Sequence, residues 1–364
     1  MNSADPVLAL IRPEILALAP YSSARKESKG GRIWLDANEN PETPSAHQPL
    51  LNRYPDPQPP ALIEKLATLY GVAPAQVLVT RGSDEGIDLL LRTFCRAGQD
   101  AILTTPPTYG MYTVAAGIQN ARVVTVPLIL ENNFSLDIDA VIAAGLAAPK
   151  PADAPECRVK LIFLCSPNNP TGQQLDRASV LRIVKALATR AVVVVDEAYV
   201  EFAGQPSLAT EIAAHHNLVV LRTLSKAYGL AGARVGATLA SPAVISVLQK
   251  VIAPYPVATP VLNAAIAALS VEGLAAARES VCQLVGERQR LLAALPFFPA
   301  VKRVWPSDAN FFLIEVADSA RVMAAGRARG VIWRDRSKDV PNTIRITVGT
   351  ADENNVTQEI LSRV

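Results

Sequence analysis

The sequence has few of the residues on which several common enzyme classes depend. Its only histidines are His47, His215 and His216, which disfavours both a zinc enzyme with histidine ligands and a Ser-His-Asp hydrolase. The motifs GxGxxG, GxxxxGK(S/T) and GxSxG do not occur, so the usual signatures of dinucleotide binding, of a P-loop and of an α/β-hydrolase are missing. The four cysteines are widely spaced and form no CxxC pair, which predicts reduced thiols in a cytoplasmic protein. We predict no metal site.

Long apolar runs and an excess of one charge are also missing. The first apolar stretch, VLALIRPEILALAP, is interrupted by Arg12, Pro13 and Glu14, so it does not have the continuous apolar core of a signal peptide. No run approaches the roughly 18 residues needed to cross a bilayer. The 35 Lys and Arg residues nearly balance the 33 Asp and Glu residues and are scattered, which indicates neither nucleic-acid nor membrane binding. We expect a cytoplasmic globular protein whose ligands are small molecules.

The chain does have a regular alternation of short apolar runs and longer helical patterns. The run AVVVV at residues 191–195 is apolar at every position, as expected of a central strand covered on both faces. This alternation predicts an α/β fold with a large, doubly wound, mostly parallel sheet. The runs assigned to that sheet are VLVT (77–80), AILTT (101–105), ARVVTVPL (121–128), VKLIFLCS (159–166), AVVVVDEA (191–198), LVVLRTLSK (218–226) and RVGATLA (234–240).

The pattern changes after Pro254. Helical segments rich in alanine and leucine lead to RVW, NFFLIEV and TIRITVG, which predicts a smaller α+β domain. At 364 residues the chain exceeds what a single core usually supports. We therefore divide it into an N-terminal arm (1–30) that packs on the small domain or on a partner, a large domain (31–255) and a small C-terminal domain (256–364).

Polar residues follow several of the predicted strands, at the sheet edge where open α/β proteins bind their ligands. RGSDEG (81–86) places Ser83 and two acidic residues at the start of a helix, where free amides can bind phosphate, although an ordinary capped helix has the same pattern. SPNNPTG (166–172) is typical of a rigid turn, and its asparagine amides serve either the turn or a ligand.

Two further motifs place charges at the ends of apolar strands. In VVVVDEAY, Asp196 faces a large desolvation penalty unless a cation or strong donors meet it, and a structural salt bridge would meet this demand as well. In TLSKAYGLAGAR (223–234), Lys226 and Arg234 follow the run LVVL. A lone lysine in a loop is ordinarily a solvated charge.

Taken together, these motifs match the needs of a phosphorylated pyridine cofactor. Such a cofactor requires a lysine for a Schiff base and a carboxylate that keeps its ring nitrogen protonated. It also requires donors for its phenolic oxygen and a phosphate cup of hydroxyl, arginine and helix-start amides. Tyr109, in PPTYGMY, could stack on the ring.

The order of motifs resembles the histidinol-phosphate aminotransferases, which are fold-type I pyridoxal-phosphate enzymes. The resemblance covers nearly the whole chain through NENP, RYPDPQ, RGSDEGIDLL, PPTYGMY, SPNNPTG, DEAYVEF, RTLSKAYGLAGAR, VIAPYP and IRITVGT. It implies that the large domain binds pyridoxal 5'-phosphate. Lys226 would form the Schiff base, Asp196 would pair with the ring nitrogen, Asn169 and Tyr199 would bond the ring hydroxyl, and Tyr109 would stack on the ring. Lys226, Asp196 and Tyr199 would be the catalytic residues.

The same resemblance implies a phosphate cup and a substrate pocket. The cofactor phosphate would be held by Ser83, Asp84 (through backbone amides), Ser225, Arg234 and, from the partner subunit of a homodimer, Tyr54. Arg345 would bind the carboxylate of glutamate in a bidentate fork. Arg334 would bind the substrate phosphate, with Tyr21 and Asn38 in the same pocket, although for Arg334 a surface ion pair remains an alternative.

The implied reaction is a ping-pong transamination in histidine biosynthesis. It would convert L-histidinol phosphate and 2-oxoglutarate into imidazole-acetol phosphate and L-glutamate. Two alternatives on the same scaffold are an aromatic amino-acid aminotransferase and a pyridoxal-phosphate-dependent decarboxylase of a phosphorylated amino acid. A non-catalytic member of the fold is a third, but it would have no need of Lys226.

Overall fold

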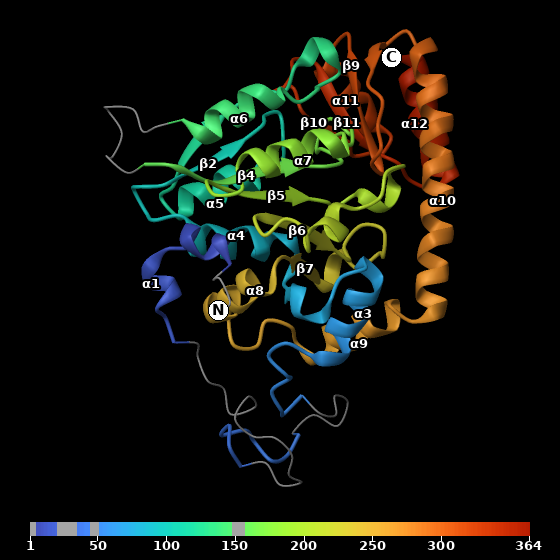
Figure 1. Ribbon diagram of the computed structural model, residues 1–364. Helices are drawn as coiled ribbons and strands as arrows, with labels where there is room; N and C mark the ends of the chain where they lie inside the picture. Colours follow the sequence, from blue (N-terminus) through green and yellow to red (C-terminus); the bar gives the residue numbers. More distant parts are fainter. Residues whose placement is uncertain (1–4, 20–34, 44–50, 148–156) are drawn as a thin grey trace.

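A computed structural model describes residues 5–19, 35–43, 51–147 and 157–364. Its centre is a seven-stranded sheet with the order β1-β7-β6-β5-β4-β2-β3 (Figure 1). The strands are parallel except β7, which runs antiparallel to both of its neighbours. Their bounds are β1 Val77–Thr80, β2 Ala101–Thr104, β3 Arg122–Thr125, β4 Val159–Cys165, β5 Val192–Asp196, β6 Leu218–Thr223 and β7 Gly236–Leu239. The predicted doubly wound, mostly parallel sheet is confirmed.

Helices cover both faces of this sheet, which is why its central strands are apolar at consecutive positions. In β5, Val193 and Val195 belong to one hydrophobic cluster, and Val192 and Val194 belong to another. The first cluster is closed by α3 (Pro60–Tyr70), α6 (Ile138–Leu146), α7 (Arg177–Ala186) and α9 (Thr259–Ala268). The second is closed by α4 (Gly82–Phe94), α5 (Met111–Ile118) and α8 (Pro242–Val251).

A second, antiparallel sheet follows in the C-terminal part of the chain, with the order β10-β11-β9-β8. It packs against α11 and α12 and the end of α10 through an apolar cluster of its own. The bounds are α10 Val271–Ala294, β8 Val301–Val304, β9 Phe311–Val316, α11 Ser319–Ala328, β10 Arg334–Asp335, β11 Thr343–Thr347 and α12 Ala351–Arg363. The predicted second unit is therefore α+β, as the change of pattern after Pro254 indicates.

Helix α10 connects the two sheets. It has 24 residues, about 36 Å of helix, and contacts α9 near its start and α12 near its end. Figure 1 shows it running beside both sheets. In the described part of the chain no single helix is long and apolar enough to cross a membrane. The pair Thr259–Ala268 and Val271–Phe297 passes that test only together, and it is bent by 70°.

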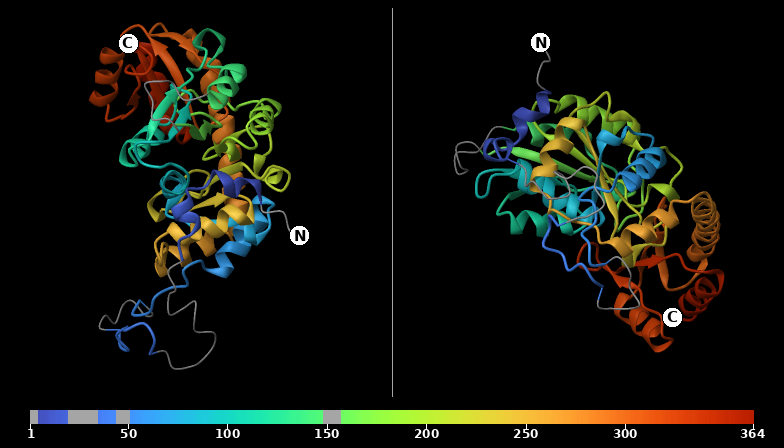
Figure 2. Two further views of the ribbon diagram at one scale, coloured as in Figure 1. Left: turned by 60° about the vertical axis from the view of Figure 1, so that its left-hand side comes forward. Right: turned by 90° about the horizontal axis from the view of Figure 1, so that it is seen from below.

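The start of the N-terminal arm packs on the large sheet unit. The short helices η1 (Pro6–Leu10) and α1 (Pro13–Leu16) contact α8, and Figure 2 shows this N-terminal segment against the large sheet unit. Val7, Leu10 and Ile11 are buried in the cluster that α4 and α8 close. This differs from the expected packing on the small domain, because the apolar side chains of the arm complete the core beneath α8. Packing of the arm on a partner stays a prediction.

Candidate active site

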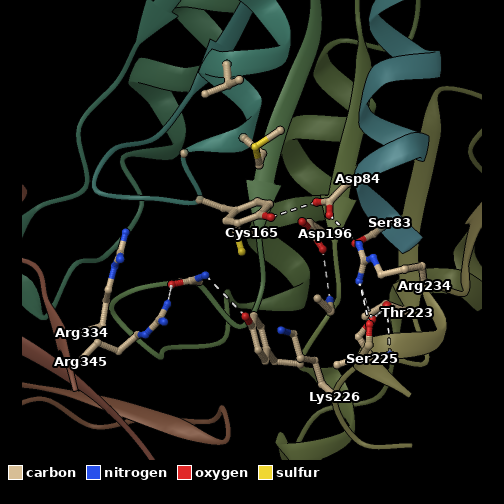
Figure 3. Close-up of a pocket in the computed structure, with 18 of the residues that line it drawn as sticks. Ser83, Asp84, Cys165, Asp196, Thr223, Ser225, Lys226, Arg234, Arg334 and Arg345 are labelled. Carbon is tan, nitrogen blue, oxygen red and sulfur yellow. Dashed lines mark hydrogen bonds and ion pairs between the residues drawn. The ribbon is translucent and has the colours of Figure 1, made fainter. Parts of the chain in front are cut away.

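A pocket of about 580 Å³ lies where the two sheets approach each other. One wall comes from the carboxyl ends of β4, β5 and β6 and from the start of α4, and the opposite wall comes from β10 and β11. Figure 3 shows Arg334 and Arg345 on one side of this pocket and Arg234 with Ser225 on the other. The sequence-predicted residues that line it are Ser83, Asp84, Tyr109, Asn169, Asp196, Tyr199, Ser225, Lys226, Arg234, Arg334 and Arg345.

The start of α4 forms one end of the pocket. Its N-cap residue makes no side-chain cap, so the first backbone amides of the helix are available to an anion. Gly82 has φ +74°, and a Cβ at this position would lie 2.7 Å from Nη2 of Arg234. Glycine therefore allows the guanidinium to approach the helix start. Arg234 donates to Ser225 Oγ at 3.4 Å and to Asp84 Oδ2 at 3.0 Å.

Asp196 is the buried carboxylate of the site. Its exposed fraction is 2%, and burial raises the pKa of its carboxyl to about 6 despite two hydrogen bonds that act in the opposite direction. Tyr112 donates its hydroxyl to Oδ2 at 2.8 Å, and the backbone amide of Ala198 donates to Oδ1 at 3.2 Å. No cation forms an ion pair with Asp196 within the described residues, so the structural salt bridge that the sequence left open is not seen there.

Lys226 projects into the pocket from the loop after β6. Its Nζ lies 5.5 Å from the centre of the Tyr199 ring. The pocket walls remove part of the water around the ammonium group, and this desolvation, followed by the nearby Arg345, lowers the pKa of Lys226. At a given pH, a lysine with a lowered pKa is more often in the neutral amine form, which is the nucleophilic form.

A chain of polar contacts joins the two walls. Arg345 donates through Nη1 to Oδ1 of Asn169, and Nδ2 of Asn169 donates to the Tyr199 hydroxyl at 3.5 Å. Burial raises the pKa of the Tyr199 hydroxyl, so it stays protonated. Arg345 comes from β11, and its register partner across the strand pair is Arg334 of β10.

Tyr109 also lines the pocket. Its hydroxyl donates to Asp84 Oδ1 at 2.9 Å, and its ring meets Tyr112 edge-on with 5.6 Å between the ring centres. Asp84 therefore bonds both Tyr109 and Arg234 through its side chain, in addition to the backbone role that the sequence analysis expects. Stacking of Tyr109 on a bound ring stays a prediction.

Two predicted residues do not line the pocket, and a third lies outside the described part of the chain. Tyr54 is half exposed and stacks on Tyr255, with ring centres 4.5 Å apart. Asn38 has φ +56° and is absent from the residues that line the pocket. Tyr21 lies outside the described residues.

Several residues of the site were not predicted from the sequence. Thr223 lines the pocket; it lies two positions before Ser225, to whose Oγ it donates at 2.9 Å. Tyr112 is fully buried behind the pocket and reaches it only through its hydrogen bond to Asp196. Arg336 lies two positions after Arg334, so strand alternation alone would have placed both on one face. Cys165, at the end of β4, also lines the pocket and had no local sequence signal.

Comparisons with known proteins agree with this architecture. A sequence profile described as aminotransferase class I and II matches residues 32–361. Histidinol-phosphate aminotransferase of Stenotrophomonas maltophilia is 46% identical over 357 residues, which is 96% of this chain and 95% of the relative. Histidinol-phosphate aminotransferase of Escherichia coli K12 is 45% identical over 348 residues, which is 94% of each chain.

A solved structure extends the likeness to three dimensions. Histidinol-phosphate aminotransferase from Sinorhizobium meliloti, in complex with pyridoxal-5'-phosphate, superposes with a TM-score of 0.73 at 26% identity, covering 85% of this chain and 82% of that one. Sequence, fold and pocket thus lead to one assignment: the chain belongs to the aminotransferase class I and II family.

Proposed function

We propose that the chain transfers an amino group between L-histidinol phosphate and 2-oxoglutarate, with pyridoxal 5'-phosphate as its cofactor, in the biosynthesis of histidine. The products are imidazole-acetol phosphate and L-glutamate. One arrangement supports the proposal above all: Lys226 and the buried Asp196 share a pocket that has cationic groups at both ends. The relatives from Stenotrophomonas maltophilia and Escherichia coli K12, which are 46% and 45% identical to this chain, carry this activity in their names.

The residues present fit pyridoxal phosphate. The uncapped start of α4, with Arg234 and Ser225 beside it, suits the cofactor phosphate. Asp196 lacks an ion-pair partner within the described residues and could take a protonated ring nitrogen. Lys226, with its lowered pKa, could bind the cofactor aldehyde covalently. Asn169 and the protonated Tyr199 would hydrogen-bond the ring hydroxyl, and Tyr109 would cover one face of the ring.

When bound, this cofactor supplies an electron sink for charge that develops on the substrate carbon. The side chains of the protein supply positioning and proton transfer. Nζ of Lys226 accepts a proton from the substrate carbon and donates it again. Asp196 holds a proton on the ring nitrogen. Because burial raises the pKa of its carboxyl, the carboxylate gains more from a cationic partner here than it would in water.

The second wall binds the two amino donors in turn. Arg345 offers the planar fork that binds a carboxylate through two hydrogen bonds, and Arg334 would bind the phosphate ester. Asn38 and Tyr21 are proposed to complete this substrate pocket. The pocket lies between the two sheets and is lined by residues of both. This position supports the division of the chain into a large domain (31–255) and a small domain (256–364).

We also infer a cytoplasmic homodimer, with no nucleic-acid or membrane partner. All four cysteines are free thiols, which suits a reducing compartment. Tyr54 is half exposed outside the pocket of its own chain, a position that suits contact with the cofactor phosphate of a partner subunit.

A single half-reaction tests the proposed function. The protein loaded with pyridoxal phosphate is mixed with L-histidinol phosphate in the absence of an acceptor, and the absorption spectrum is followed, with L-phenylalanine in parallel. We expect conversion of the cofactor to its amine form with histidinol phosphate and little with phenylalanine. Equal or faster conversion by phenylalanine would indicate an aromatic amino-acid aminotransferase. No spectral change with either would contradict transamination and favour a decarboxylase or a non-catalytic protein.

The substitution Lys226→Ala tests the assigned nucleophile. Cofactor should still bind through the phosphate cup, while turnover falls by several orders of magnitude because the groups of an active site act as a unit. The measurement is steady-state turnover together with the cofactor dissociation constant. Near-normal turnover in this variant would overturn the assignment.

A further inference from the structure

Three arginines meet on the wall of the pocket that the second sheet supplies. Arg334 and Arg336 both line the pocket, whereas the intervening Asp335 does not, as expected for alternating side chains along an extended strand. The backbone amide of Arg336 donates to the carbonyl oxygen of Thr343 at 2.9 Å, so strand pairing continues past the end of β10. Arg345 lies opposite Arg334 on β11.

These arginines carry more positive charge than their surroundings neutralise. Arg336 pairs with Asp339, with 2.8 Å between Nε and Oδ2. Arg345 bonds the neutral amide of Asn169, and Arg334 has no ion pair within the described part of the chain. Arg336 and Arg334 both help to lower the pKa of the Arg345 guanidinium, through like-charge repulsion that adds to its burial. Within the described residues, Asp339 is the only carboxylate that forms an ion pair with any of these three guanidinium groups.

Arg336 is also held in place. Its side chain is only 18% exposed, and the ion pair with Asp339 anchors the guanidinium from the side of its own turn. An arginine that is already ordered loses less conformational entropy when it binds a ligand. Such a residue suits a defined anion better than a freely moving surface arginine does.

The two proposed amino donors differ in charge at the end that this wall would bind. A phosphate ester carries nearly two negative charges near neutral pH and three terminal acceptor oxygens. The side-chain carboxylate of glutamate carries one charge and two oxygens. A lone arginine can satisfy the carboxylate, while a second guanidinium is useful only for the dianion.

Building on the proposed function, we propose that Arg336 acts with Arg334 as a two-arginine clamp for the phosphate ester, and that Arg336 sets the preference for phosphorylated over carboxylate-bearing donors. Arg334 contacts either ligand. Arg336 engages only the larger and more highly charged one.

The test replaces Arg336 by a neutral side chain of similar reach. Three proteins are loaded with pyridoxal phosphate: wild type, Arg336→Gln and Arg336→Lys. Each is titrated with L-histidinol phosphate and, separately, with L-glutamate. The half-reaction rate and the apparent affinity for each donor are measured at one ionic strength. Arg329→Gln is the matched control, because Arg329 is a surface arginine paired with Glu359 and its loss changes the net charge equally. Binding of inorganic phosphate to each protein is measured by calorimetry.

We expect Arg336→Gln to weaken the binding of histidinol phosphate by about tenfold or more, the size of effect typical of losing a charge-assisted hydrogen bond. The apparent affinity for glutamate should change by less than about threefold. Arg336→Lys should retain part of the preference for histidinol phosphate, and Arg329→Gln should bind both donors as the wild type does. Equal losses for both donors, or no loss for histidinol phosphate, would overturn the clamp.

Failure of the proposed function would look different. In that case wild-type protein would not react with histidinol phosphate at all, and the phosphate calorimetry would still decide on Arg336. Weaker phosphate binding in Arg336→Gln than in Arg329→Gln supports the clamp. Equal binding in these two variants rejects it.

Discussion

At the scale of single residues, Asp196 has the most unusual environment in the pocket. Its carboxyl has an ordinary pKa of 3.8 that burial raises to about 6 in the folded protein. The folded state therefore prefers the protonated acid. This preference adds to the free energy of unfolding below about pH 4, and the contribution is lost as the pH rises through about 6. A cationic ring nitrogen bound beside the carboxylate would reverse the preference, so cofactor should bind best above that pH.

The substitution Tyr112→Phe tests how Asp196 is positioned. The hydroxyl that is lost donates a hydrogen bond that lowers the pKa of Asp196. Without it, the pKa of Asp196 should rise further above about 6. The pH below which the protein loses affinity for the cofactor should rise with it. Phenylalanine keeps the stacking on Phe163, where the ring centres are 4.8 Å apart. The measurement is the cofactor dissociation constant as a function of pH. The second ionisation of the cofactor phosphate affects wild type and variant equally.

Tyr70→Phe is the control for the loss of a buried hydroxyl. Tyr70 is 5% exposed and its hydroxyl has no hydrogen-bond partner within the described residues, so the pH profile should match wild type. An unchanged midpoint in Tyr112→Phe would mean that its hydrogen bond does not tune Asp196.

At the scale of elements, the contact between β7 and the start of α4 controls the proposed phosphate cup. A Cβ on Gly236 would lie 2.5 Å from the carbonyl carbon of Gly82 and 2.6 Å from the amide nitrogen of Ser83. These are backbone atoms, which cannot turn aside as a flexible side chain can. The strand therefore approaches the helix start this closely because position 236 has no side chain.

The substitution Gly236→Ala should push the first turn of α4 away from Arg234. We expect a loss of about 1–3 kcal/mol in the free energy of unfolding, as for other overpacked sites, and weaker cofactor binding. Urea denaturation of the apoprotein and the cofactor dissociation constant measure the two effects. Gly232→Ala is the control, because a Cβ there meets nothing within 4 Å. Wild-type values for Gly236→Ala would show that the close approach is not required.

At the scale of the whole molecule, we predict that a second chain completes the proposed site. Light scattering should give about twice the chain mass of 38.7 kDa, and Tyr54→Phe should weaken cofactor binding by several-fold through loss of a hydrogen bond to the phosphate. The same substitution should leave the oligomeric mass unchanged. A monomeric mass together with unaltered cofactor binding in Tyr54→Phe would contradict a shared active site.

Much of the fold and half of the pocket could be read from the sequence, for a local reason. Parallel strands all end at one edge of the sheet, so the polar residues after each strand must meet there. That is why Asn169, Asp196 and Lys226, which follow three different apolar runs, lie in one pocket. The apolar run of β5 likewise required helices on both faces.

The other half depended on contacts between residues far apart in the chain. Tyr112 reaches Asp196 across 84 positions, and Arg345 reaches Asn169 across 176. Neither contact has a sequence pattern, because each depends on how one packed unit lies against another. Arg222 illustrates the same limit: it precedes Lys226 by four positions, yet it is buried away from the pocket and pairs with Glu197 and Glu201. The sheet and the residues at its edge could be predicted from the sequence, because backbone periodicity sets both. The charges that face the pocket became known only from the folded structure, because long-range packing decides where each side chain lies.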